Sequence, residues 1–271
     1  MLIDTHCHLD AAEFNADRDT VVLHANQVGV HKIVIPSVAR NNFQAVIDLA
    51  QQYAHCYVAL GIHPMYVDHA QPSDLTILKQ LILEQLASAS SKIVAVGEIG
   101  LDFFVTQHNR ETQEYFFTEQ LKIAYLFNLP VILHVRRAVD EVLKHLRRYP
   151  VAGGIAHAFN GSPQQAEAFI KLGFKLGFGG AMTYPRALKI RELAKNLPLD
   201  SIVLETDAPD IPPEWIGTKG RNSPAELVKI AQVFADLRGI EVSQIIENTG
   251  KNAVEILPKL AGLYTPLKVL H

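Results

Sequence analysis

Eight short apolar runs recur through the chain and limit its fold more than any other feature. They are almost continuously apolar rather than alternating, which indicates strands buried on both faces of a parallel sheet. Segments of helical periodicity separate them, so strands and helices alternate along the whole sequence. The runs are Leu2–Thr5, Lys32–Pro36, Tyr57–Ile62, Ile93–Ile99, Pro130–His134, Gly154–His157, Phe174–Phe178 and Ser201–Thr206.

The helical segments carry clear periodicity and start signals. Leu75, Leu78, Ile82 and Leu86 form one apolar stripe at helical spacing. Two segments begin with a capping serine, a proline at the first helical position and a glutamine or glutamate at the third. These starts are 162–165 and 223–226, and further helices are expected over 19–28, 43–53, 116–125, 226–237 and 245–257.

This alternation predicts a (β/α)₈ barrel of the TIM type with an extra C-terminal helix. An open, doubly wound sheet is the alternative. No low-complexity linker or break in composition divides the sequence, so we expect one domain over residues 1–271.

Composition excludes several classes of protein. The 25 basic and 28 acidic residues nearly balance, which argues against a protein that coats nucleic acid through general positive charge. Cys7 and Cys56 are the only cysteines, so a disulfide framework is not expected. No apolar run is long enough to span a bilayer, and no signal peptide opens the chain. We therefore expect a cytoplasmic protein with no membrane contact and no obligate protein partner.

Residues that bind metals stand where the predicted strands end. Because all strands of such a barrel end at one mouth, these side chains are expected to share a site there. Taken singly, each has an ordinary structural interpretation, except the pair His6 and His8, which project to the same side of a strand end. Together, closely spaced imidazoles and carboxylates require a cation to neutralise them. The residues are His6, His8, His63, Glu98, His134, His157, Glu205 and Asp207.

The number of ligands favours two divalent metal ions. One would be bound by His6, His8 and Asp207, the other by His134 and His157, with Glu98 as a bridge. Mixed imidazole and carboxylate ligands suit Zn, Mn or Fe, and Mg less well. Two such ions activate water for hydrolysis. The remaining histidines are not assigned to the site; they are His24, His31, His55, His69, His108, His145 and His271.

Six short motifs, in order along nearly the whole chain, resemble those of the TatD family, a branch of the amidohydrolase-like metal-dependent hydrolases. They are 3–10, 61–64, 96–102, 130–134, 157–161 and 205–209. The sequence departs from many members at Ala158 and Asn160, where those members have Cys and Ser. Two arginines follow His134, at 136 and 137.

The resemblance implies a metal-dependent deoxyribonuclease on a TIM barrel. It places the metal ligands at His6, His8, Glu98, His134, His157 and Asp207. Glu205 resembles a residue that holds the attacking water, and His63 one that contacts the scissile phosphate. The basic loop 219–224 resembles the loop that lies beside a phosphate.

We therefore expect cleavage of phosphodiester bonds in DNA, on single strands or strand ends. Asp207 would take the proton of the attacking water with help from Glu205. His63, Arg136 and Arg221 would bind the substrate phosphate. The alternatives are a hydrolase of a small-molecule amide, ester or lactone, and a metal-containing scaffold without turnover. Glu98 favours the nuclease over the small-molecule hydrolases, because many of those bridge their metals with a modified lysine at this strand.

Overall fold

Eight parallel strands form one sheet in which each strand pairs with the next along the chain. The computed structural model describes residues 1–105, 107 and 109–261. Thr5 N donates to Leu204 O, and Cys7 bridges to Ala208, so the last strand returns to the first. The predicted (β/α)₈ barrel is confirmed. Its strands are β1 Leu2–Asp4, β2 Val30–Pro36, β3 Cys56–Leu60, β4 Ile93–Asp102, β5 Val131–Arg136, β6 Gly154–Ala156, β7 Phe174–Phe178 and β8 Ile202–Leu204.

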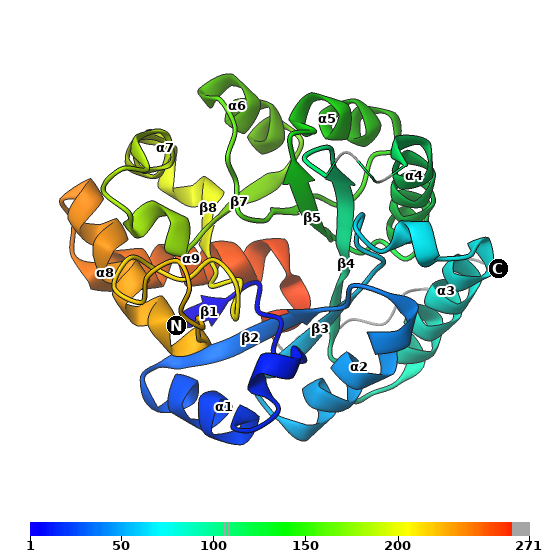
Figure 1. Cartoon of the computed structure of the whole chain (residues 1–271), viewed down its shortest axis with the longest axis horizontal. Coiled ribbons are helices and arrows are strands. Elements are labelled where there is room, and N and C mark those ends of the chain that lie inside the picture. Colours follow the sequence, from blue (N-terminus) through cyan, green and yellow to red (C-terminus); the bar gives the residue numbers. More distant parts are fainter. Residues whose placement is uncertain (106, 108, 262–271) are drawn as a thin grey trace.

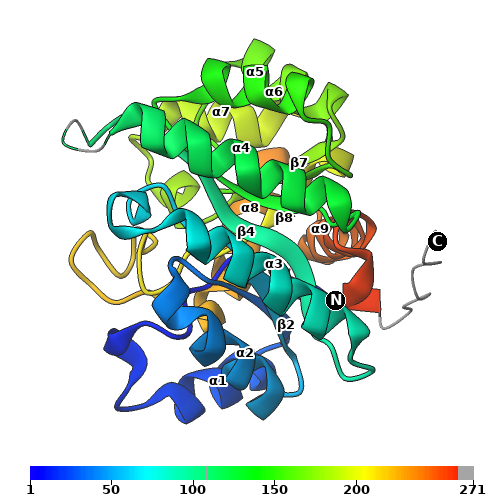
Figure 2. The same cartoon turned by 90° about the vertical axis from the view of Figure 1, so that its right-hand side faces the viewer.

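Helices surround the strands as an outer layer (Figure 1). They are α1 Arg18–Gln27, α2 Phe43–Gln52, α3 Pro72–Ala87, α4 Arg110–Leu126, α5 Val139–Arg148, α6 Pro163–Lys171, α7 Leu188–Asn196 and α8 Leu227–Arg238. The expected extra helix is α9, Val242–Ile256. Figure 2 shows α9 on the side of the barrel opposite the long loops that follow β3, β4 and β8. No helix among the described residues is long and apolar enough to cross a membrane.

The core has two parts. Apolar side chains of the strands fill the barrel interior, and α9 and the turn after it cover the end away from the long loops. The second, larger part lies between the sheet and the surrounding helices. With one end of the barrel closed by packing, the other is left for a site. The interior residues are Ile3, Val34, Ala59, Val94, Ala95, Ile132, Ile155 and Val203, with Ala253, Ile256, Leu257 and Leu260 below them.

Two local predictions need correction. Glu98 and His134 do not end the fourth and fifth strands, because β4 continues to Asp102 and β5 to Arg136, where the two strands still pair. Ser162 and Gln165 form the predicted capping box, but Ser223 and Glu226 do not. Ser223 caps a short 3₁₀ turn instead, and the Glu226 carboxylate accepts a hydrogen bond from Trp215, which removes it from the cap.

Candidate active site

The ends of β1, β3, β6 and β8 and the C-terminal halves of β4 and β5 bring seven of the predicted site residues together. They are His6, His8, His63, Glu98, His134, His157 and Asp207, whose side-chain atoms lie within 4 Å of one or more of the others. His6 and His8 face the same side, as their spacing predicts, with Nε2 atoms 3.2 Å apart. Of the histidines not assigned to the site, His108 and His271 lie outside the described residues.

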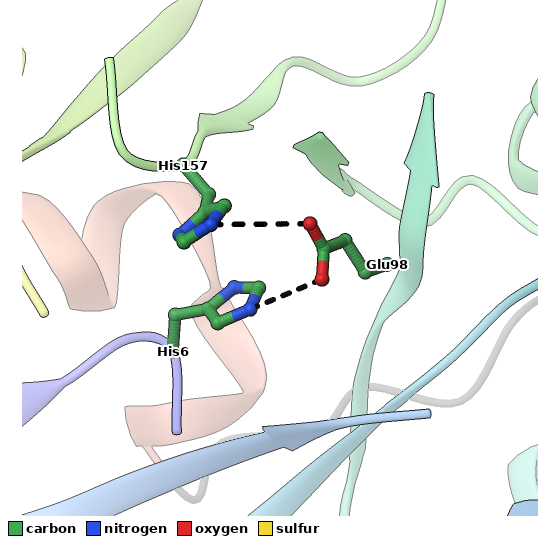
Figure 3. Close-up of side chains that lie close together, drawn as sticks. All are labelled: His6, Glu98 and His157. Carbon is green, nitrogen blue, oxygen red and sulfur yellow. Dashed lines mark ion pairs between the residues drawn. The ribbon is translucent and has the colours of Figure 1, made fainter. Parts of the chain in front are cut away.

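Glu98 stands at the centre of the cluster, and its two carboxylate oxygens face different sets of imidazoles. Oε2 lies 3.2 Å from His6 Nε2 and 3.6 Å from His8 Nε2. Oε1 lies 3.0 Å from His134 Nδ1 and 3.9 Å from His157 Nε2. Figure 3 shows the two oxygens directed separately at His6 and His157. A carboxylate in this orientation can bridge two cations.

The first set of donor atoms has the spacing that a tetrahedral cation requires. Bonds of about 2.0–2.2 Å in a tetrahedron place the ligand atoms about 3.3–3.6 Å apart. His6 Nε2 and His8 Nε2 lie 3.5 and 3.7 Å from Asp207 Oδ1, and 3.2 and 3.6 Å from Glu98 Oε2. Imidazole nitrogens and carboxylate oxygens together suit a borderline cation such as Zn²⁺. The residues present therefore fit a divalent metal ion.

The second set has its own supporting carboxylates. His134 Nδ1 faces Glu98, and its Nε2 lies 3.0 Å from Asp102 Oδ2. His157 Nε2 faces Glu98, and its Nδ1 lies 3.1 Å from Glu205 Oε1. Histidines that bind metals commonly direct their other nitrogen at a carboxylate, which fixes the ring and its tautomer. Each of the two histidines thus directs one nitrogen at Glu98 Oε1 and the other at a supporting carboxylate, and the candidate ligand groups that share Glu98 are His6 with His157 and His63 with His134.

The cluster shifts the pKa values of its members in opposite directions. Burial and the neighbouring His157 hold the pKa of His6 well below its ordinary value. Burial opposes the charged form of His8, but hydrogen bonding to Glu98 and the charge of Asp207 raise its pKa to about 9. Burial likewise opposes ionisation of Glu98, yet the surrounding imidazoles hold its pKa well below the usual range. Burial raises the pKa of Asp207 to about 6.

The backbone near Asp207 holds this carboxylate in place. Asp207 adopts a left-handed conformation with φ of 59°, which aspartate tolerates better than most residues. Its N–H donates to His6 O at 2.8 Å. The buried Asp4 accepts hydrogen bonds from Thr206 N and Thr206 Oγ1, and so fixes the preceding residue as well. The ends of β1 and β8 are thereby tied together at the site.

Glu205 is buried behind His157 rather than in the open cleft. Its Oε1 also accepts a 2.5 Å hydrogen bond from Ala158 N, and its Oε2 has no hydrogen-bond partner among the described residues. Gly177 makes room for it, because a Cβ there would lie 2.1 Å from Glu205 Oε2. A small cavity of about 20 Å³ beside Glu205 has room for one water molecule.

An open cleft of about 830 Å³ lies over the cluster, and its walls differ in charge. Arg136 lines the wall on the β5 side, whereas Asp10, Glu13 and Asp210 line the wall near β1 and β8. The structure does not bring Arg221 to this cleft. Its guanidinium pairs with both oxygens of Asp17 and donates to the Glu13 carbonyl.

Sequence reasoning did not identify several residues that shape this site. Asp102 lies within the 96–102 motif, but its contact with His134 depends on pairing between β4 and β5. Gly177 and Asp4 act through Glu205 and Thr206, which lie far away in the chain. No local pattern marks such residues; only the position of Asp102 four residues after Glu98 on one strand was a usable signal.

The family model described as "TatD related DNase" matches residues 3–258. The chain is 42% identical over 247 residues to the uncharacterized metal-dependent hydrolase YjjV of Escherichia coli K12, covering 90% of this chain and 93% of that protein. It is 31% identical over 269 residues to human deoxyribonuclease TATDN3, covering 97% and 96%. The crystal structure of E. coli YjjV superposes with a TM-score of 0.89 at 40% identity, covering 95% of this chain and 98% of that one.

Proposed function

The chain belongs to the family of TatD-related deoxyribonucleases and is a metal-dependent hydrolase, and from this premise we propose that it cleaves phosphodiester bonds in DNA through a dinuclear metal site. Human TATDN3, one of its relatives, is named a deoxyribonuclease. Single strands and strand ends are the proposed substrates, because their phosphates can enter a mouth surrounded by loops.

The observation that carries the proposal is the orientation of Glu98. One of its oxygens faces His6 and His8, and the other faces His134 and His157. We assign His6, His8 and Asp207 to one cation, His134 and His157 to the second, and Glu98 to both. Two cations bound this closely supply an activated water and neutralise charge on the phosphoryl oxygens.

The protein's own residues would then orient the substrate and move the proton. Asp207 accepts the proton of the attacking water, since its carboxylate lies between the two groups of ligands, with Oδ1 3.5 Å from His6 Nε2 and Oδ2 3.8 Å from His157 Nε2. His63 Nδ1 accepts a hydrogen bond from Met65 N, so its Nε2 carries the proton. This Nε2 lies 3.5 Å from Glu98 Oε1 and His63 lines the cleft, so it can donate to a phosphate oxygen bound beside Glu98. Glu205 orients His157, which follows from the contact between them.

Of the two arginines predicted to contact the substrate, Arg136 is positioned to bind one of its phosphates and Arg221 is not. Arg136 lines the cleft, whereas Arg221 is occupied by Asp17. A few local cations must provide the affinity for DNA, because the chain carries a formal net charge of −3. Each phosphate bound contributes a salt slope of about −0.7 on single strands, so we expect a shallow dependence on salt.

The test is hydrolysis of end-labelled single-stranded DNA by protein depleted of metal and then reloaded with Zn²⁺, Mn²⁺, Fe²⁺ or Mg²⁺. Lactone, ester and amide panels are assayed in parallel at equal protein concentration. The proposal expects DNA cleavage that disappears on chelation and returns with one of the cations. Turnover of a small ester or lactone with none of DNA would replace the nuclease by the small-molecule hydrolase.

A further inference from the structure

Two arginines at the end of β5 share one aromatic ring beside the cleft. The Arg136 guanidinium carbon lies 3.9 Å from the centre of the Phe104 ring, and that of Arg137 lies 4.5 Å from it. Phe104 follows β4, the strand beside β5 (Figure 1), and is 43% exposed. Stacking on an aromatic face holds the plane of a guanidinium and leaves its N–H edges available.

These N–H edges have no protein acceptor among the described residues. Several other arginines bind protein acceptors: Arg221 pairs with Asp17, Arg40 pairs with Asp74, and Arg18 donates to the Leu9 and Asp10 carbonyls. Arg110, Arg148 and Arg186 also lie over single rings, but in the described part of the chain each is the only arginine on its ring. Arg136 and Arg137 have only their contacts with Phe104. Two stacked guanidinium groups without a carboxylate partner are arranged to bind an anion through bidentate hydrogen bonds.

The position of Arg136 relates this pair to the catalytic cluster. His134 and Arg136 are two residues apart on β5, so their side chains leave the strand on the same side, about 6.7 Å apart along it. That separation is comparable with the spacing of successive phosphates in an extended nucleotide chain. The opposite wall of the cleft carries Asp10, Glu13 and Asp210, which would repel a second phosphate there.

We propose that Arg136 and Arg137, stacked on Phe104, form an anion subsite for the phosphate adjacent to the scissile one. The subsite rests on the proposed function, because it assumes a substrate with successive phosphates. It sets the direction of the substrate: the chain leaves the metal centre along the β5 wall, away from the acidic wall.

The test is a thermodynamic cycle of the double-mutant type. It combines Arg136→Ala in the protein with removal of the charge from one linkage of a short DNA strand. The probe is a labelled trithymidylate with two phosphorothioate linkages, which keep their charge and resist hydrolysis. Two further probes each carry one neutral methylphosphonate in place of one phosphorothioate. Their dissociation constants are measured by fluorescence anisotropy on metal-loaded wild-type and variant protein.

A charged hydrogen-bonded contact predicts about a 10-fold weaker Kd for Arg136→Ala with the fully charged probe. Neutralising the linkage that faces the subsite should also weaken binding by the wild type about 10-fold. The same change should hardly weaken binding by Arg136→Ala any further, since the contact is already lost in that variant. Arg137→Ala and Phe104→Leu should shift Kd in the same direction. Arg148→Ala, which removes a guanidinium stacked on Tyr149 at the far end of α5, should leave it unchanged.

Three results would each overturn the subsite. One is that the losses in affinity from Arg136→Ala and from neutralising a linkage are additive for both linkages. The others are that Arg136→Ala binds with the wild-type Kd, or that wild-type binding does not depend on the charge of either linkage. Cleavage of the ordinary phosphodiester trithymidylate is followed in parallel. If this strand is not cleaved but the two changes remain non-additive in binding, the nuclease function is wrong and the subsite stands. If the strand is cleaved but the two changes are additive in binding, the subsite is wrong and the nuclease function stands.

Discussion

Replacing Glu98 by glutamine tests whether one carboxylate serves both groups of histidines. Glutamine has nearly the same shape, but it is neutral and offers one oxygen and one NH₂ group. Whichever way the amide turns, its NH₂ group would face either His6 and His8 or His134 and His157. Since an amide nitrogen with its hydrogens does not bind a cation, one of the two sites should be lost.

The size of the effect follows from linkage between metal binding and folding. A cation at 100 times its Kd stabilises the folded chain by about 2.7 kcal/mol. One kcal/mol moves Tm by about 2–4 °C in domains of roughly this size. Two bound cations should therefore raise the wild-type Tm by about 10–20 °C, and Glu98→Gln should lose at least half of that gain.

The assay is elemental analysis of bound metal together with thermal unfolding, with and without chelator. The chelated Tm of each protein is its own reference, because Glu98 is 1% exposed and its replacement changes the stability of the metal-free chain too. Glu84→Gln on the exposed surface of α3 serves as the matched control. Glu98→Gln protein that keeps two metal equivalents and the wild-type thermal gain would refute the bridge.

Three further outcomes are expected. Asp207→Asn, with metal restored, should lower kcat at least ~10²-fold because an amide cannot accept a proton, and near-full activity would place the base elsewhere. At pH 7, metal-free protein keeps protons on His8 and His157, whose pKa values are raised to about 9 and 10. Burial opposes the charged form of His134, but hydrogen bonding to Asp102 and Glu98 raises its pKa as well. Zn²⁺ binding should therefore release two or more protons and tighten with rising pH, as calorimetry in buffers of different ionisation enthalpy would show; no release would contradict this. Gly177→Ala should cost about 1–3 kcal/mol and weaken the cation at His157, because its Cβ would displace Glu205; an unchanged Tm would argue against this packing.

The local pattern of the sequence was enough to predict the barrel and most of the cluster. Strands that alternate with helices run parallel, so their C-terminal ends must meet at one mouth, and any residue just after such a strand is brought there. His6 and His8, two residues apart, face the same side for the same reason that strand side chains alternate. The local pattern did not determine where strands end, as the extension of β4 to Asp102 and of β5 to Arg136 shows, because pairing between these strands decides where they stop.

Only the tertiary structure decided which side chains touch across strands. Arg136 and Arg221 look alike in the sequence, but Arg221 meets Asp17 across the first and last parts of the chain, and Arg136 meets Phe104 across β4 and β5. Asp102 and Glu205 stand behind His134 and His157 through similar contacts. Such contacts depend on how strands and loops from distant parts of the sequence are placed in space, and spacing along the sequence does not determine that placement.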